Sequence, residues 1–307
     1  MKPTRRPVHG VLLLDKPSGI TSTAALARAK RALAAAKAGH TGTLDPMASG
    51  LLPLCFGEAT KFAADLLDAD KFYCATLKLG VTTTTGDAEG EVLVTRPVDV
   101  DQAAIDAALD LHRGAIAQIP PMYSALKRDG KPLYEYARSG VTLERDARDV
   151  EIKRLVTTAF DGINLTIEVD CSKGTYIRTL AEDIGEVLGC GAHLVALRRT
   201  CVGSLRLADA IELDAFEALA LEQRDAKLLP LDTLIASLPR IDLDPAMSAR
   251  FLHGQRLPLP DASDCGRVRV YGFVDTTRSS APTLLGIANL RDDGVLAPQR
   301  LMLQMPR

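Results

Sequence analysis

The carboxylate best placed for nucleophilic chemistry in this sequence is Asp45, within residues 39–50, GHTGTLDPMASG. The three glycines of this run allow tight turns, and Pro46 biases Asp45 toward an extended backbone. An acid held in a rigid loop beside apolar Leu44 and Met47 has the environment of an activated nucleophile. Asp-Pro is also a common turn dipeptide. The loop alone therefore leaves a catalytic and a purely structural role open.

A second candidate functional segment is residues 171–178, CSKGTYIR, where a strand is expected to end and a helix to begin. Such turns present free N–H groups that suit an anion. Arg178 could pair with a buried carboxylate, or with Glu182 four residues later in a surface ion pair. Tyr73 and Tyr176 could stack on a nucleic-acid base, although most tyrosines pack at the edge of a core.

The sequence lacks the motifs that are typical of several enzyme classes. It has no phosphate-binding loop, no His-Glu-x-x-His, no Gly-x-Ser-x-Gly and no Gly-x-Gly-x-x-Gly. The zinc-deaminase signature is also absent. The five histidines are too scattered to predict a metal site, at positions 9, 40, 112, 193 and 253.

Mixed strands and helices must position these residues. We expect a helix that begins at Thr21 or Ser22 and runs to about Lys37, and a hairpin around Asp161-Gly162. The other expected strands are 11–14, 51–56, 72–79, 150–160 and 163–171, and the other helices are 58–67, 101–112, 134–138, 175–188 and 213–221. Because no regular βαβ alternation appears, the fold class is α+β with a mixed, largely antiparallel sheet.

Length and turn residues predict two domains. At about 150 residues per domain, 307 residues correspond to roughly two. Residues 230–245, which contain prolines, are expected to be a linker. Beyond them the β patterns at 268–274, 284–290 and 301–303 predict a small β-barrel. The expected division is a catalytic domain over 1–235 and a C-terminal domain over 240–307.

The overall charge of −2 does not by itself indicate a polyanionic partner. Residues 1–37, however, hold eight basic side chains and one acidic one, a local net charge of +7. No stretch approaches 18 consecutive apolar residues, and the run at 11–14 is too short for a signal-peptide core. The six cysteines form no Cys-x-x-Cys pair, which favours reduced thiols and a cytoplasmic protein.

Seven separated blocks, taken together, resemble the bacterial TruB family of tRNA pseudouridine-55 synthases. They cover about residues 10–230, and the tail resembles the family's PUA-like RNA-binding domain more loosely. The blocks are GVLLLDKPSG (10–19), GHTGTLDPMASGLLP (39–53), GEATK (57–61), LG with Thr82, Thr85 and Asp87 (79–87), MYSALK (122–127), CSKGTYIR (171–178) and AHL with LRR (192–199).

The resemblance implies a role for individual residues. Asp45 would be the nucleophile, Tyr73 would stack on the target uracil, and Arg178 would pair with Asp45 and keep it ionised. His40, Tyr176 and Leu197 match positions that line the flipped nucleotide, and Lys16 matches a basic residue near it. Two departures from the family pattern are Phe72, where relatives often carry a basic residue, and Thr43, which replaces a frequent alanine.

The implied reaction breaks the N1–C1′ bond of uridine, turns the base and joins C5 to C1′. No atoms enter or leave, so no cofactor and no metal are expected. The sequence does not decide between attack of the carboxylate and assistance to departure of the base. Three alternatives remain: a non-catalytic RNA-binding protein on this scaffold, a synthase for another uridine, and a hydrolase with an aspartyl nucleophile.

The implied partner is the T-arm stem-loop of tRNA, bound by a monomer that does not act at a membrane. Phosphates would meet the basic N-terminal segment, Lys16 and the helix near residues 28–37. In the tail, further phosphate contacts are expected at Arg250, Arg256, Arg267, Arg269 and Arg278.

Overall fold

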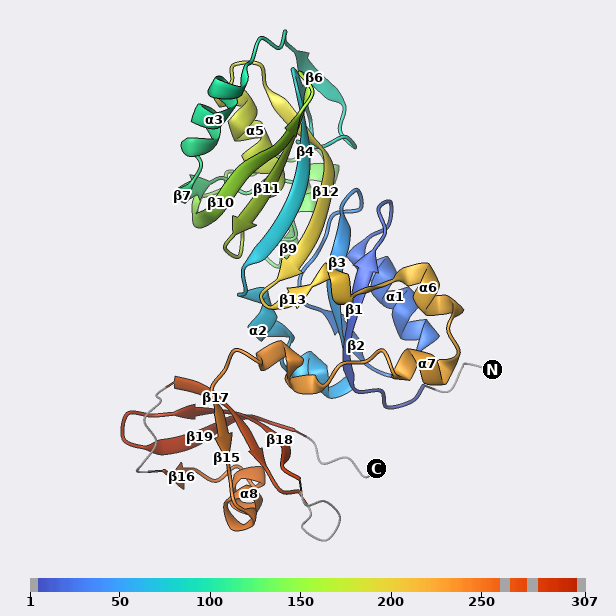
Figure 1. Ribbon diagram of the computed structural model, residues 1–307, viewed down its shortest axis with the longest axis vertical. Helices are drawn as coiled ribbons and strands as arrows, with labels where there is room; N and C mark the ends of the chain where they lie inside the picture. The colour runs from blue at the N-terminus through green and yellow to red at the C-terminus, as the bar shows by residue number, and fades with distance from the viewer. Residues whose placement is uncertain (1–4, 260–265, 275–280, 303–307) are drawn as a thin grey trace.

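The computed structural model describes residues 5–259, 266–274 and 281–302. Within these residues the chain forms one large and one small β-sheet, with helices packed against both (Figure 1). Lys2, Arg278, Cys265 and Leu303, which enter the sequence-based expectations, lie outside the described residues.

The large sheet has ten strands in its described part, and most neighbouring strands are antiparallel. Parallel pairs occur where β1 meets β14 and where β3 meets β12. The predicted mixed, largely antiparallel sheet is therefore confirmed. In spatial order the strands are β14 (Ile211–Glu212), β1 (Gly10–Lys16), β3 (Ser49–Phe56), β12 (Ala192–Val202), β4 (Lys71–Leu79), β11 (Asn164–Cys171), β10 (Arg148–Phe160) and β7 (Gly114–Gln118), with β2 (Ala38–His40) beside β3 and β13 (Leu205–Arg206) beside β12.

Helices cover the large sheet and close its main core. The α-helices are α1 (Ser22–Ala32), α2 (Ala63–Leu67), α3 (Gln102–Asp110), α4 (Leu133–Arg138), α5 (Ile177–Val187), α6 (Leu213–Ala218), α7 (Leu221–Asp225) and α8 (Pro245–Leu252). The described part of the chain also contains three short 3-10 helices, η1 (Gly57–Lys61), η2 (Leu207–Asp209) and η3 (Leu231–Ile235). The amphipathic pattern of α5 buries Leu180 and Ile184 in the same cluster as Ile167 of β11.

Several element ends differ from the sequence-based expectation. Helix α1 starts where predicted, since the Thr21 hydroxyl accepts from the amide of Ala24. It ends at Ala32 rather than near Lys37, because the chain turns through Ala34 at φ 49° and residues 38–40 pair with β3. The expected helix 213–221 is divided into α6 and α7, and the expected helix 58–67 into η1 and α2.

The smaller sheet follows the large one along the chain. Its strand order is β15 (Arg240–Asp242), β17 (Gly266–Gly272), β18 (Thr283–Leu290), β19 (Val295–Leu301) and β16 (Leu257–Pro258). It curls into a half-barrel, where the sequence predicted a small barrel (Figure 1). Two further pairs are β5 (Val81–Thr83) with β6 (Val92–Thr95), and β8 (Lys127–Arg128) with β9 (Lys131–Pro132).

The expected linker over 230–245 is instead ordered structure that packs between the two sheets. It contains η3 and β15. Leu234 and Ile235 are buried in a cluster that includes Val11 of the large sheet and Ile287 of the small one. The apolar side chains between its prolines explain the difference, because they have a surface on each side to pack against. None of the described helices is long and apolar enough to cross a membrane.

Candidate active site

Asp45 lies in the loop between β2 and β3, and neighbouring segments hold this loop from both sides. The buried Ser22 hydroxyl donates to the carbonyl of Leu44 at 2.9 Å and accepts from its amide at 2.8 Å. The amide of Gly19 donates to the carbonyl of Pro46 at 2.8 Å. The residues on each side of Asp45 are thus fixed by hydrogen bonds to the start of α1 and the turn before it.

The Asp45 carboxylate forms an ion pair with the guanidinium of Arg178, with 3.0 Å between Oδ2 and Nε. Arg178 has a 5% exposed side chain, whereas that of Asp45 is 35% exposed. Two other nitrogens of Arg178 donate to the carbonyls of Thr85 and Tyr123. The ion pair implied by the family resemblance is therefore present, and Arg178 is directed toward Asp45 rather than into a surface pair with Glu182.

The pKa of Asp45 is raised above its ordinary value, because burial disfavours the charged carboxylate. Nearby Arg178 and Lys16 act in the opposite direction and lower it, but they do not reverse the shift. Pairing with Arg178, taken alone, predicts a lowered pKa. In the structure the net change in the pKa of Asp45 is upward instead, because desolvation is the largest cause.

A second carboxylate, the buried Asp87, also lies close to Arg178. Its Oδ2 is 3.6 Å from Nη1 of Arg178, and its side chain is 4% exposed. Its Oδ1 accepts from the Thr85 hydroxyl and from the amide of Glu89. Asp87 appeared in the sequence only as part of a matching block and received no role. A Gly-Asp pair after four threonines was the available signal.

Lys16 does not lie where a phosphate could reach it. It is fully buried, and its ammonium donates to the carbonyls of Pro17, Ile20 and Pro46. Burial lowers the pKa of Lys16 to about 8. The expectation of a phosphate contact at Lys16 is therefore wrong: this side chain braces the loop of Asp45 from inside because its three donors are used by main-chain oxygens.

Tyr73 and Leu197 come from neighbouring strands, β4 and β12. Tyr73 pairs across the sheet with Arg199, and Leu197 pairs with Ala75. Tyr73 and Leu197 both pack in the main core cluster, which also contains Leu44 from the Asp45 loop. Burial is the largest cause that raises the pKa of the Tyr73 hydroxyl. The negative charge of Asp45 acts in the same direction.

His40 and Tyr176 complete the set of expected site residues. His40 ends β2, and burial and the charge of Arg199 lower its pKa. Tyr176 is the residue just before α5, and the buried side chain of Gln118 both accepts from its amide and donates to its carbonyl. Gln118 was not singled out from the sequence; it lies at the end of β7 and orients the helix start that carries Arg178.

The basic N-terminal segment is partly neutralised within the protein. Arg6 pairs with Asp225, and Arg28 pairs with Asp214 and Glu217. In the C-terminal sheet Arg267 pairs with Asp65 of α2. Three of the arginines expected to meet phosphates are thus held by carboxylates that lie far away in the sequence.

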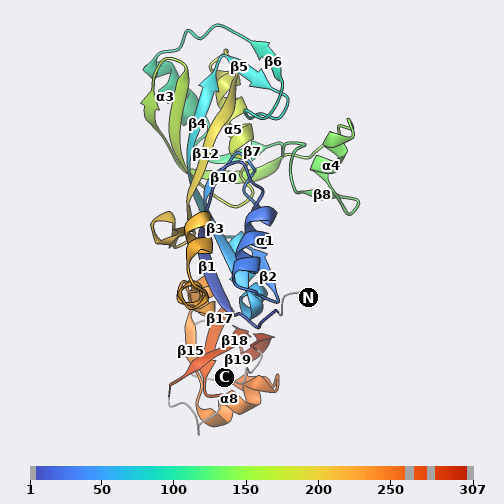
Figure 2. The ribbon, with the colours of Figure 1, turned by 90° about the vertical axis from the view of Figure 1, so that its right-hand side faces the viewer.

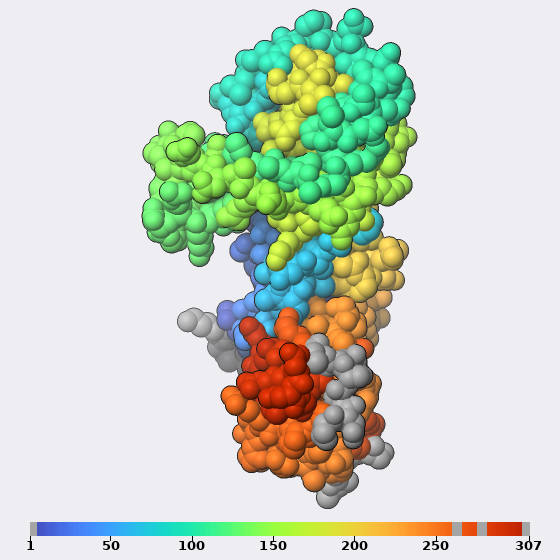
Figure 3. Space-filling view, turned by 90° about the vertical axis from the view of Figure 1, so that its left-hand side faces the viewer, coloured from blue at the N-terminus to red at the C-terminus, as the bar shows by residue number. Residues whose placement is uncertain are grey.

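A projecting arm, residues 120–147, carries further cations. It contains β8, β9 and α4 and stands out from the body of the protein (Figures 2 and 3). Lys131 lies over the ring of Tyr136, and Arg138 lies over that of Tyr134. One of the two carbonyls that accept from Arg178 is that of Tyr123. The base of the arm therefore contacts the arginine that pairs with Asp45.

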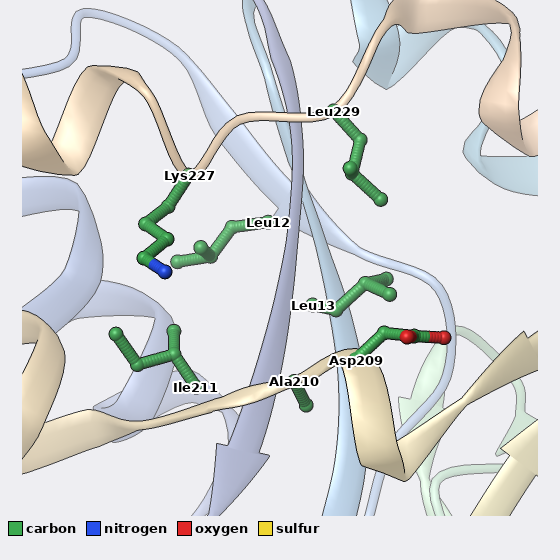
Figure 4. Close-up of a pocket in the computed structure, with 7 residues that line it drawn as sticks. All are labelled: Leu12, Leu13, Asp209, Ala210, Ile211, Lys227 and Leu229. Carbon is green, nitrogen blue, oxygen red and sulfur yellow. The ribbon is translucent and has the colours of Figure 1, made fainter.

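No metal cluster marks the site within the described chain. Those residues contain no group of three or more His, Cys, Asp or Glu side chains arranged to hold a metal ion. A pocket of about 150 Å³ lies elsewhere, between β1 and the segments around Asp209 and Lys227 (Figure 4). It includes none of the expected site residues.

Three family models together match residues 30–302. Residues 30–177 match the TruB family pseudouridylate synthase N-terminal domain, 178–238 the tRNA pseudouridylate synthase B C-terminal domain, and 239–302 the pseudouridine synthase II TruB C-terminal domain. A tRNA pseudouridine synthase B from Burkholderia mallei (strain NCTC 10247) is 60% identical over 97% of this chain and 98% of its own length. One from Ralstonia pickettii (strain 12J) is 59% identical over 98% and 96%.

Two solved structures contain a chain with the same fold as this one. A Cbf5-Nop10-Gar1 complex contains a chain that superimposes with a TM-score of 0.73 at 25% identity, over 95% of this chain and 84% of its own. An H/ACA RNP bound to a substrate RNA containing 2'-deoxyuridine gives 0.72 at 24% identity, over 97% and 86%. The family models, the curated relatives and the ion pair on the Gly-rich loop lead to one conclusion: this chain belongs to the TruB family of pseudouridylate synthases.

Proposed function

We propose that this chain converts the uridine at position 55, in the T-loop of tRNA, into pseudouridine, with Asp45 as the nucleophile. Membership of the TruB family and the curated relatives make the chain a pseudouridine synthase that acts on tRNA. The position of the uridine and the role of Asp45 are the proposal. The observation that carries it is the Asp45 carboxylate, 3.0 Å from the buried guanidinium of Arg178 and near enough for its charge to act on Tyr73.

The chemistry requires a carboxylate at the sugar-base junction. The N1–C1′ bond breaks, the base turns, and C5 bonds to C1′; the proton lost from C5 is balanced by the proton gained at N1. Asp45 assists this exchange either by attack or by supporting departure of the uracil anion. Arg178 orients the carboxylate and favours its charged form against the effect of burial.

The target base must leave its stack before Asp45 can reach it. Extrusion costs a few kcal/mol, and stacking on one aromatic ring returns about 1–3 kcal/mol. Tyr73 is our candidate for that ring, with Leu197, His40 and Tyr176 around it. Sequence-specific RNA readout of this kind suits a loop, where bases can be splayed out, better than a regular helix.

The arm over residues 120–147 is our candidate for the main RNA-binding surface of the catalytic domain. Lys127, Arg128 and Lys131 are not in an ion pair with any described carboxylate, unlike Arg6 and Arg28. Cations that are not neutralised within the protein remain available to phosphates. Because the base of the arm touches Arg178, RNA held by the arm would lie next to Asp45.

The division of labour between the sheets is also a proposal. We assign catalysis to residues 1–235 and additional RNA affinity to residues 240–307, where Arg250 and Arg256 are exposed. We also propose a monomer as the active species. Light scattering of the purified protein with and without tRNA would test that state.

The direct test is to compare wild-type protein and Asp45→Asn on unmodified tRNA and on an isolated T-arm stem-loop. Pseudouridine is mapped at single-nucleotide resolution, with a transcript that carries cytidine at position 55 as the substrate control. We expect modification at position 55 by the wild type alone, a loss of about 10⁴-fold or more in rate for the variant, and unchanged RNA binding. Asp68→Asn, which removes an exposed partner of Lys173, is the matched protein control.

Three outcomes would contradict the proposal. Modification at another uridine would show that the chain is a synthase whose target is not position 55. Appreciable turnover by Asp45→Asn would remove the nucleophile assignment. Binding without turnover by the wild type would favour the non-catalytic RNA-binding protein.

A further inference from the structure

A buried arginine beside the site, Arg199, has no part in the chemistry described so far. Its side chain lies on β12 directly across from Tyr73 on β4, and cross-strand neighbours on one face of a sheet are in contact distance. Arg199 is 2% exposed and is among the largest fully buried side chains of the described residues. A role for Arg199 in this site rests on the proposed function, because it concerns how that same site is held.

Arg199 connects both ends of the loop that carries Asp45. At the far end its Nε donates to the carbonyl of Leu51 at 2.8 Å, and its backbone pairs with Gly50. A Cβ on Gly50 would lie 2.3 Å from the carbonyl oxygen of Arg199, so only glycine permits this approach. At the near end a Cβ on Gly42 would lie 3.8 Å from Nη1, which places the guanidinium against that turn.

The charge of Arg199 is not neutralised by any carboxylate among the described residues, and its Nη2 has no hydrogen-bond partner there. A buried cation without a counterion is unfavourable for stability. Such a group calls for an explanation in function. The groups that Arg199 acts on electrostatically include Tyr73, His40, Lys16 and Lys71. Of these, Tyr73 is the one proposed to stack on the target base.

We propose that Arg199 is a positioning residue for the isomerisation, which fixes the Tyr73 phenol relative to the Asp45 loop and sets the direction of its hydroxyl. A guanidinium can only donate hydrogen bonds. A phenol oxygen that faces Arg199 across the two strands would therefore be an acceptor, with its single proton directed away, available to the nucleotide or to Asp45. Burial is the largest influence on the pKa of Tyr73 and raises it, whereas the positive charge of Arg199 acts in the opposite direction.

The test compares Arg199→Met and Arg199→Lys with Arg224→Met. Arg224 is the matched control, since it also donates to main-chain carbonyls only, those of Phe216, Ala32 and Glu217, away from the site. We expect Arg199→Met to lower kcat by about 10²-fold with KM nearly unchanged, and Arg199→Lys to lose less because the charge remains. Arg224→Met should keep the wild-type kcat.

Two readouts separate positioning from a merely structural role. The first is a double-mutant cycle: in a Tyr73→Phe background, Arg199→Met should change kcat by less than about threefold, because residues that act as a unit are not additive. The second needs no RNA. With difluorotyrosine at position 73, the fluorine resonance should titrate at higher pH in Arg199→Met than in the Arg199 parent, and the shift should be smaller in Arg199→Lys, which keeps the charge.

An additive cycle, or a fluorine titration that does not move, would overturn the inference and leave Arg199 a structural residue. If Arg199→Met does not fold, Arg199→Lys decides by the same two readouts. Failure of the proposed function is distinguishable, because modification of a different uridine would leave both the cycle, measured at that uridine, and the RNA-free titration as predicted here.

Discussion

At the scale of single residues, the site is a carboxylate poised between opposing influences. Burial raises the pKa of Asp45, and Asp87 raises it further, whereas Arg178 and Lys16 lower it. A desolvated carboxylate is a stronger nucleophile than a hydrated one, provided that it is ionised at the working pH. Arg178 therefore matters less as a source of binding energy than as the group that keeps Asp45 charged where partial burial disfavours the charge.

This balance predicts the pH dependence of catalysis. Asp45 must be ionised to act, and its pKa lies above the ordinary aspartate value of about 3.9. The single-turnover rate should therefore fall on acidification at a pH higher than for an ordinary carboxyl group. Replacing Arg178 by Met removes the main influence that lowers this pKa, so the acid limb should move to still higher pH. A limb that stays in place in that variant would mean that another group controls it.

Arg178→Lys tests the geometry rather than the charge. Lysine retains the charge, but it cannot reach Asp45, Thr85 and Tyr123 together as the planar guanidinium does. We expect a loss of about 10²-fold or more in rate, with RNA binding weakened less. The matched control is Arg154→Lys, in an exposed pair with Glu168, which should keep its rate and stability because such pairs contribute little. Equal rates in the two variants would contradict the role of Arg178.

At the scale of elements, the arm over residues 120–147 unites two properties in one segment. Its base is bound to Arg178 through Tyr123. Its outer part, which stands away from the body (Figure 2), contains Lys127, Arg128 and Lys131. An element of this kind can couple RNA binding to the arrangement around Asp45. Its strands, β8 and β9, are only two residues each, so its own internal pairing is short.

Neutralising the arm should weaken RNA binding by removing charges that meet phosphates. With Lys127, Arg128 and Lys131 all changed to Gln, the slope of log affinity against log salt should become shallower by about 0.7–0.9 for each phosphate that is no longer neutralised. The rate at saturating RNA should change little. The control is Gln at Arg113, Lys153 and Arg154, which removes the same charge from cations that are paired with carboxylates. Equal slopes for the two triple variants would place the RNA elsewhere.

At the scale of the whole molecule, the two sheets share an apolar cluster, which changes what a truncation should do. Leu234 and Ile235 pack with Val11 and Phe62 on one side and with Ile287 on the other. An ion pair also crosses between the two parts of the molecule, since Arg267 of the small sheet pairs with Asp65 of α2. A chain that ends at Pro239 would expose these side chains, and it would not behave as an independent domain behind a free linker.

We expect the chain truncated after Pro239 to retain turnover at saturating tRNA, because every proposed site residue precedes Leu197 or is Leu197 itself, apart from the positioning residue Arg199. Its melting temperature should fall because the shared packing is removed, and its affinity and salt slope should fall because fewer phosphates are neutralised. Ile287→Ala in the full chain isolates the first effect, since it reduces the shared packing and leaves the arginines in place. A truncated chain with wild-type stability would show that the shared cluster contributes nothing.

Much of this organisation could be predicted from the sequence. Apolar periodicity and turn residues are local, and they correctly predicted β1, β4, the β10–β11 hairpin and α5. The Gly-rich loop around Asp45 and the matching blocks predicted the family. They also predicted that Arg178 would meet Asp45, although 133 positions separate the two in the numbering. The helices and strands are encoded in residue types at short spacing, whereas the pairing of Asp45 with Arg178 was implied by the resemblance to the family.

The tertiary structure alone decided which charges are buried and which are neutralised. From the sequence, Lys16 was expected to contact a phosphate, but in the structure its ammonium donates to three carbonyls. Arg6 was expected to be a free cation, but it is paired with Asp225. Asp87 and Arg199 gain their roles only when the strands and turns bring them beside Arg178 and Tyr73. Electrostatic energies depend on distance and desolvation through space, and neither is a property of sequence spacing.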